Sequence, residues 1–156
     1  MTTANQQGLQ SSPRDKADDT PHVVRLTIPA KSQYVILCRL ALTGFARLRQ
    51  LPDELLADLK LALTEAASNS VRHAYPHGDG HVEVRYELRG DVLTIEVSDE
   101  GGGFDYDREP VVDGLGEVTE GGLGIAIIRS IADELVLGRG SDGRGSRLRF
   151  VKSLSG

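Results

Sequence analysis

Two segments of alternating apolar and polar residues, separated by only three residues, constrain the fold of this chain more than any other feature. HVEVRYEL (81–88) and VLTIEVSD (92–99) both repeat with the period of two that is typical of β-strands. Arg89-Gly90-Asp91 lies between them and is short enough for a tight turn, which predicts an antiparallel hairpin. One face of this hairpin is apolar, so we expect helices to pack against it.

The residues before the hairpin predict one strand and two helices. VVRLTI (23–28) alternates and ends at Pro29, which fits a strand. A second segment, from Ser32 to about Arg49, has the spacing of an amphipathic helix. A further helix begins at Pro52, has acids in its first turn and runs to about Tyr75. The expected apolar face of the first helix consists of Leu37, Leu40, Ala41, Gly44, Phe45 and Leu48.

The residues after the hairpin predict a third helix over 123–135 and a closing hairpin. LVLGRG (135–140) and SRLRFVKS (146–153) form this hairpin around Asp142-Gly143. The order of elements favours an α/β (α+β) two-layer sandwich, with helices on one face of a mixed, mostly antiparallel sheet. We expect a disordered N-terminal tail over 1–21 and one folded domain over 22–154.

Composition argues against several classes of protein. The net charge is −5 and aromatic residues make up 4%, which disfavours direct binding of nucleic acid. No apolar run is long enough for a membrane span, and the first twenty residues do not resemble a signal peptide. Cys38 is the only cysteine, so we expect a buried structural thiol and a cytoplasmic location.

Three polar residues interrupt the apolar pattern of the second helix. Glu65, Asn69 and His73 are spaced by four residues and form one stripe on the helix surface. Such a stripe is either a solvated face or a site for metal and acid–base chemistry. An Asn carbonyl suits Mg²⁺, and a carboxylate one turn away suits a general base. His73 is either a further polar contact or a structural residue near the helix end.

The acid that ends the hairpin is the second polar feature. The period of two places Asp99 on the apolar face of its strand, where a carboxylate is costly unless it is hydrogen-bonded. Gly101 and Gly103 follow it and remove side chains where another group could approach the backbone. The segment is either a turn capped by Asp99 or a pocket for the amine of a flat ligand such as adenine.

A second glycine-rich segment lies where the third helix is expected to begin. Gly121, Gly122 and Gly124 would expose the free N–H groups of a helix N-terminus, which suit phosphate, or would simply make a flexible join. Residues 104–120, between the two glycine segments, are long for a loop and suit a lid over a ligand. Ser146 could add a hydroxyl to the base pocket or satisfy a strand end.

These motifs, taken in order, resemble those of the GHKL (Bergerat-fold) ATPases. They are ExxxNxxxH at 65–73, DxGxG at 99–103, GGLG at 121–124 and GS at 145–146. The short length is most similar to the anti-sigma factor serine/threonine kinases of the RsbW and SpoIIAB type. The resemblance covers about residues 23–151.

The resemblance implies a role for each candidate residue. Glu65 would be the general base, Asn69 the ligand of Mg²⁺ and Asp99 the acceptor for the adenine amine of ATP. The other ATP-binding residues that it implies are Gly101, Gly103, Gly122, Leu123, Gly124 and Ser146. Ser146 would reach the base through water, and backbone amides of 122–124 would donate to phosphates.

The resemblance also implies partners. Proteins of this type sequester a sigma factor and phosphorylate a Ser or Thr of an anti-sigma factor antagonist. They are typically homodimers, and residues 23–50 would contribute to partner surfaces.

One departure from the family pattern favours an alternative function. The segment 104–120 has only Arg108 against six acids, whereas phosphoryl transfer needs positive charge, from Mg²⁺ or from Arg129. The alternative is an ATP-binding partner-switch module that regulates by binding, without phosphotransfer.

Overall fold

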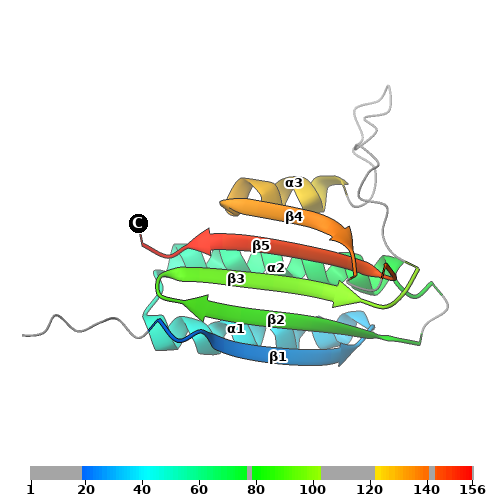
Figure 1. The fold of residues 1–156 in the computed structure, drawn as a ribbon, viewed down its shortest axis with the longest axis horizontal. Coiled ribbons are helices and arrows are strands. Elements are labelled where there is room, and N and C mark those ends of the chain that lie inside the picture. The colour runs from blue at the N-terminus through cyan, green and yellow to red at the C-terminus, as the bar shows by residue number, and fades with distance from the viewer. Residues whose placement is uncertain (1–18, 77–78, 103–121, 141–142, 156) are drawn as a thin grey trace, which may run out of the picture.

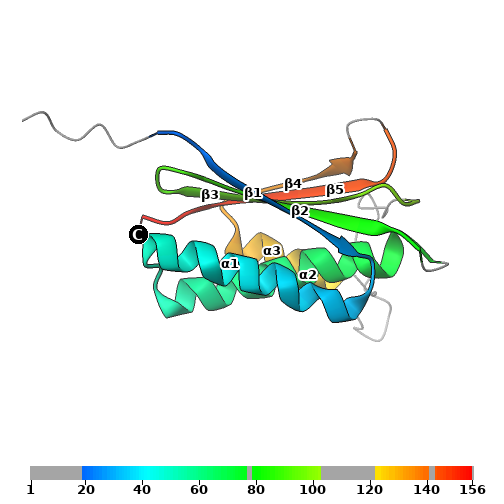
Figure 2. The ribbon, with the colours of Figure 1, turned by 90° about the horizontal axis from the view of Figure 1, so that it is seen from below.

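The structure, a computed structural model, describes residues 19–76, 79–102, 122–140 and 143–155. Its strands form one layer and its helices a second layer on one face of the sheet (Figure 1 and Figure 2). This arrangement confirms the two-layer α/β sandwich. In chain order the elements are β1 (His22–Pro29), a 3-10 turn η1 (Ser32–Tyr34), α1 (Val35–Arg49), α2 (Asp53–His73), β2 (His81–Arg89), β3 (Val92–Asp99), α3 (Gly122–Ile131), β4 (Glu134–Arg139) and β5 (Ser146–Ser153).

The five strands lie in the order β1-β2-β3-β5-β4, and all the pairings among the described residues are antiparallel. β2 and β3 form the predicted hairpin, with Tyr86 opposite Ile95 and a turn in which Gly90 has a φ of 54°. β4 and β5 form the predicted closing hairpin. The predicted lid over 104–120 and residues 1–18 of the predicted tail lie outside the described residues.

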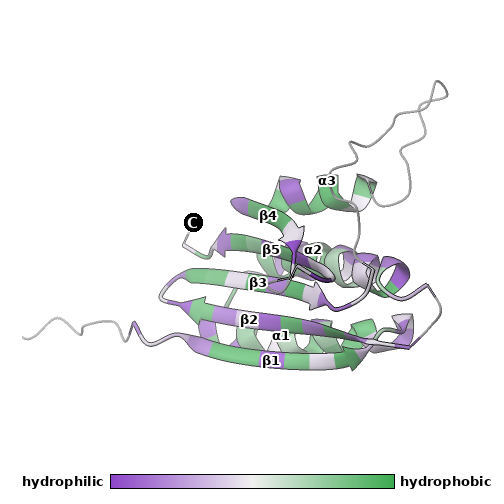
Figure 3. Cartoon of the chain, turned by 45° about the vertical axis from the view of Figure 1, so that its right-hand side comes forward, coloured by the Kyte–Doolittle hydropathy of each residue, from purple (hydrophilic) through white to green (hydrophobic). Residues whose placement is uncertain are grey.

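Hydrophobic and hydrophilic residues alternate along the strands, as the colours of Figure 3 show. The alternation gives the sheet a buried apolar inner face and a charged outer face. On the inner face Val84, Ile95 and Phe150 are buried under the helices. On the outer face Arg85, Glu96 and Arg149 lie opposite one another across β2, β3 and β5. Asp99 is an acid on the inner face, at the end of β3.

The apolar face predicted for α1 is wrong for most of its members. Leu37, Leu40 and Leu48 are 41%, 59% and 74% exposed, whereas the buried residues of the helix are Val35, Cys38, Leu42, Phe45 and Ala46. Helix α1 has apolar residues both on its buried side and on its exposed side. The spacing of apolar residues alone therefore did not identify the side that packs against the core. The thiol of Cys38 is buried, as predicted, beneath Tyr86, whose hydroxyl donates to the Cys38 carbonyl over 2.7 Å.

The predicted end of the third helix is also wrong, because α3 ends at Ile131 and Leu135 lies in β4. Asp133 sits in the connection. Its backbone N–H donates to Val151, and its carboxylate accepts from the Lys152 side chain and the Ser153 N–H. These contacts with β5 start a new strand rather than a fourth helical turn.

Within the described ranges, no helix has both the length and the apolar character that crossing a membrane requires.

Candidate functional site

Asp99 lies at the end of β3 and is 5% exposed. Its Oδ1 accepts hydrogen bonds from the backbone N–H groups of Gly101 (3.1 Å) and Ser146 (3.2 Å). Its Oδ2 accepts one from the Ser146 hydroxyl, at 2.6 Å. A carboxylate offers about four lone-pair sites. Among the described residues three are therefore used, and the remaining one is on Oδ2.

Two glycines let the backbone close tightly around Asp99. A Cβ on Gly101 would lie 1.9 Å from the carbonyl oxygen of Ala74, just beyond the end of α2. A Cβ on Gly145, which has a φ of +66°, would lie 1.8 Å from the carbonyl oxygen of Asp99. The group that approaches Gly101 is thus protein backbone, in line with the turn capped by Asp99 that was one of the two interpretations of this segment. Gly103 lies outside the described residues.

The polar stripe of α2 lies on the side of the helix that faces α3. Asn69 is completely buried, whereas Glu65 and His73 are partly exposed. Asn69 Oδ1 accepts a hydrogen bond of 3.0 Å from the guanidinium of Arg72. Its Nδ2 is buried and has no hydrogen-bond partner in the described part of the chain. A buried amide group left unpaired costs free energy, about 1–3 kcal/mol, unless a bound group satisfies it.

The beginning of α3 packs directly against this stripe. A Cβ on Gly124 would lie 2.7 Å from Glu65 Oε2 and 3.6 Å from Asn69 Nδ2. The glycine therefore keeps open the space in front of the carboxylate and the amide. Gly122 begins the helix and Leu123 is 60% exposed. The first N–H groups of a helix have no partner within the helix, so this end favours anions.

Helix α2 connects the two parts of the site. Asn69 lies beside Gly124 at the start of α3. Near the other end of the site, the Ala74 carbonyl accepts a hydrogen bond of 3.0 Å from the Gly102 N–H, next to Asp99. Asn69 and Ala74 are five positions apart, which corresponds to roughly 7.5 Å along the helix axis. The acceptor on Asp99 and the glycine-lined space at Glu65 therefore lie at two places along one helix.

Two residues of the site were missed from the sequence. Arg72 contacts Asn69 from the next helical turn, and the signal for it was a basic residue three positions after the Asn. Gly145 was included in the GS motif only as the neighbour of Ser146. Its positive φ and its contact with Asp99 show why glycine is needed there.

Comparison with known proteins identifies the family. The family model described as "Histidine kinase-like ATPase domain" matches residues 28–152. "Serine-protein kinase RsbW" of Listeria innocua is 38% identical over 122 residues, which cover 73% of this chain and 78% of that protein. "Serine-protein kinase RsbW" of Staphylococcus aureus is 33% identical over 142 residues, which cover 83% of this chain and 87% of that protein.

A solved structure supports the fold independently. It is the crystal structure of the RsbU and RsbW domains of Rv1364c from Mycobacterium tuberculosis, with a TM-score of 0.63 and 19% sequence identity. The match covers 85% of this chain and 32% of that longer chain. The chain therefore belongs to the family of histidine kinase-like ATPase domains, as a relative of the serine-protein kinases RsbW.

Proposed function

We propose that this protein is an ATP-dependent serine/threonine kinase that acts as an anti-sigma factor in the cytoplasm. The observation that carries the proposal is the buried Nδ2 of Asn69, which has no hydrogen-bond partner among the residues that the structure describes and faces the glycine-lined start of α3 beside Glu65. A ligand with several acceptor oxygens would satisfy this end of the site. The relatives named serine-protein kinase RsbW support the same activity.

ATP would span the two parts of the site. The acceptor site on Asp99 Oδ2 that no described residue occupies suits the exocyclic amine of adenine, and the Ser146 hydroxyl beside it orients the carboxylate. The backbone amides of Gly122, Leu123 and Gly124 would donate to the phosphates, since α3 begins there.

The residues present also fit Mg²⁺. The side-chain oxygen and nitrogen of an Asn exchange places when the amide turns over, so Asn69 can present its oxygen toward α3 in place of Nδ2. That turn requires Arg72 to leave Oδ1, because two donors would otherwise face each other. Asn69 would be the residue that holds Mg²⁺, and the ion would supply charge that neutralises the phosphates.

The phosphoryl transfer assigns Glu65 and Arg72 separate tasks. Glu65 would accept the proton from the Ser or Thr hydroxyl of the substrate protein, whose oxygen forms a bond to the γ-phosphorus as the bond to ADP breaks. Arg72, released from Asn69, would place positive charge beside the phosphates. Arg129, the other basic residue that could supply positive charge, lies in the last turn of α3, roughly 10 Å along the helix from Gly122.

The exposed side of α1 supports the proposed partners. Ile36, Leu37, Leu40 and Leu48 form an exposed apolar stripe, and such stripes mark protein–protein contacts. Residues 22–50, which include this stripe, contain five basic residues and none of the 23 acids of the chain. We propose that a sigma factor, an antagonist protein and a second copy of the chain are the partners, and that this stripe contributes to their binding.

The test is transfer of phosphate to a partner protein. The purified protein is incubated with Mg-ATP and an antagonist that co-purifies with it, and intact masses are compared with those for Glu65→Gln. We expect one phosphate per antagonist with the wild type and none with the variant. An antagonist that binds but keeps its mass would support the partner switch without phosphotransfer.

A further inference from the structure

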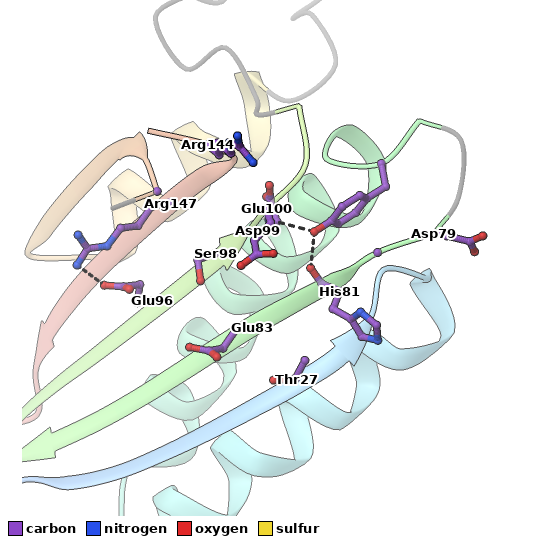
Figure 4. A pocket seen from close by; sticks show the side chains of 13 residues that line it. Thr27, Asp79, His81, Glu83, Glu96, Ser98, Asp99, Glu100, Arg144 and Arg147 are labelled. Carbon is purple, nitrogen blue, oxygen red and sulfur yellow. Dashed lines mark hydrogen bonds and ion pairs between the residues drawn. The ribbon is translucent and has the colours of Figure 1, made fainter. Parts of the chain in front are cut away.

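The hydroxyl of Tyr75 joins three segments of the chain next to the proposed base pocket. It accepts a hydrogen bond of 3.0 Å from the Glu100 N–H and donates one of 2.9 Å to the His81 carbonyl. Figure 4 marks both contacts with dashed lines. Tyr75 follows α2, His81 begins β2 and Glu100 follows β3. The hydroxyl therefore ties the helix that carries Glu65 and Asn69 to the strand end that carries Asp99.

A glycine is matched to the ring of this tyrosine. A Cβ on Gly80 would lie 2.2 Å from Tyr75 Cε1, so the ring lies flat against the Gly80 backbone. The Gly80 carbonyl accepts a hydrogen bond of 2.9 Å from the Ala30 N–H, which anchors this backbone to the end of β1. The position of the Tyr75 ring is thus fixed by the backbone at Gly80, which is itself hydrogen-bonded to Ala30. The hydroxyl of the ring is therefore held at a defined position.

Tyr75 and Asp99 both line a cavity of about 820 Å³ on the outer face of the sheet. Thr27, Glu83 and Ser98 lie in one row across β1, β2 and β3 and line this cavity (Figure 4). Tyr75, Gly80 and Glu100 line it as well. Without the tyrosine hydroxyl, the Glu100 N–H would face this cavity and its solvent. The peptide between Asp99 and Gly101 would then lose a fixed contact.

We propose that Tyr75 is a positioning residue for base recognition. Glu100 lies between Asp99 and Gly101, and the Gly101 N–H is one of the donors that orient Asp99 Oδ1. By fixing the Glu100 N–H, Tyr75 holds the orientation in which Asp99 Oδ2 keeps its open acceptor site toward the base. The proposal rests on the proposed binding of ATP, and it concerns the adenine end of the ligand alone.

The test compares ATP with a ligand that lacks the base. Tyr75→Phe keeps the ring on Gly80 and removes only the hydroxyl. We expect the Kd of the variant for Mg-ATP to rise about 3- to 10-fold, as the loss of one or two modest hydrogen bonds predicts. The Kd for magnesium tripolyphosphate should change by less than about 2-fold. In the kinase assay KM for ATP should rise while kcat stays unchanged.

Two further variants make the outcome decisive. Tyr34→Phe removes a hydroxyl for which the structure gives no hydrogen bond among the described residues, and should alter neither Kd. Gly80→Ala should displace the Tyr75 ring and raise the Kd for ATP in the same way. Equal losses for ATP and tripolyphosphate, or no loss for either, would overturn the role of Tyr75. A wild-type protein that does not bind ATP would instead overturn the proposed function.

Discussion

Ser146 binds both oxygens of the Asp99 carboxylate, through its backbone N–H to Oδ1 and through its hydroxyl to Oδ2. The two residues lie 47 positions apart and meet because β5 runs beside β3. The contact explains how an acid is tolerated on the apolar face of the sheet. Counted over the residues that the structure describes, it also leaves one acceptor site on the carboxylate, which suits a ligand amine.

Asp99→Asn should abolish binding of ATP, because the amide replaces an acceptor oxygen with a donor. ATP should raise the melting temperature of the wild type by mass action and leave that of the variant unchanged. Ser146→Ala should weaken binding about 5- to 10-fold through the loss of one hydrogen bond to a charged group. Ser130→Ala is the control, since its hydroxyl donates within α3 to Ile127, and it should bind like the wild type.

Arg72→Ala should lower kcat for phosphorylation of the antagonist by about 10- to 100-fold, because the positive charge that we propose beside the transferred phosphate is lost. The side chain itself is exposed, but Asn69 Oδ1 would lose its hydrogen bond, so the free energy of unfolding should fall by about 1 kcal/mol. Arg72→Lys should recover part of kcat. Arg129→Ala should keep full kcat, and an unchanged kcat in Arg72→Ala would refute this role.

Gly124→Ala should separate folding from activity. The new methyl group would meet Glu65 Oε2, the end of a side chain that can rotate away, while alanine favours the helix by about 1 kcal/mol. We expect a folded variant whose phosphotransfer falls at least about tenfold, since the base leaves its position. The matched control is Gly44→Ala, in the middle of α1 with no atom within 4 Å of the new Cβ. It should gain about 0.5–1 kcal/mol of stability and keep its activity.

Leu40→Ser should weaken capture of the sigma factor at least about tenfold, as removal of a central apolar contact does in other interfaces. Leu40 is 59% exposed, so both stability and the affinity for ATP should stay unchanged. Leu61→Ser removes a comparable exposed leucine, 45% exposed, from α2 instead of α1. Titration calorimetry should show normal binding for this control. Equal losses in the two variants would argue against a specific role for α1.

Cys38 should make the protein less stable in alkaline solution. Burial raises the pKa of its thiol from 9.0 to about 11, so the unfolded chain loses this proton at lower pH than the folded one. Above pH 9 the unfolded state therefore binds fewer protons, and stability falls by an amount on the order of 2 kcal/mol by pH 11. Cys38→Ala has no thiol, so its stability should not show this loss above pH 9. Denaturant titrations from pH 7 to 11 should show the two proteins converging, and parallel curves would contradict the prediction.

The sequence was most informative where polar residues break an apolar pattern. Asp99 stood out because its strand otherwise alternates cleanly, and Asn69 because its helix is otherwise buried there. The spacing of apolar residues was less informative where two sides of one helix could equally well be the buried side. In α1 both Cys38 and Leu40 belong to apolar runs, and only contacts with β2 and α2 decide which one is buried.

Contacts between segments that are distant in sequence could not be predicted from strand alternation or from helical spacing. The need for glycine at 101 comes from Ala74, which arrives from another element, and the need for glycine at 80 comes from the ring of Tyr75. The end of α3 at Ile131 depends on Asp133 meeting β5. In each case the physical cause is a neighbour that is remote in sequence.

The absence of acids from residues 22–50 gives this molecule an uneven electric field. A chain of net charge −5 carries five basic side chains on the segment that forms β1 and α1, and all of its negative charge elsewhere. Two copies that met through this segment would have like charges to accommodate, whereas an acidic partner would be drawn toward it before contact. Because salt screens such attraction over about 8–10 Å, the rate at which that partner associates should fall as ionic strength rises.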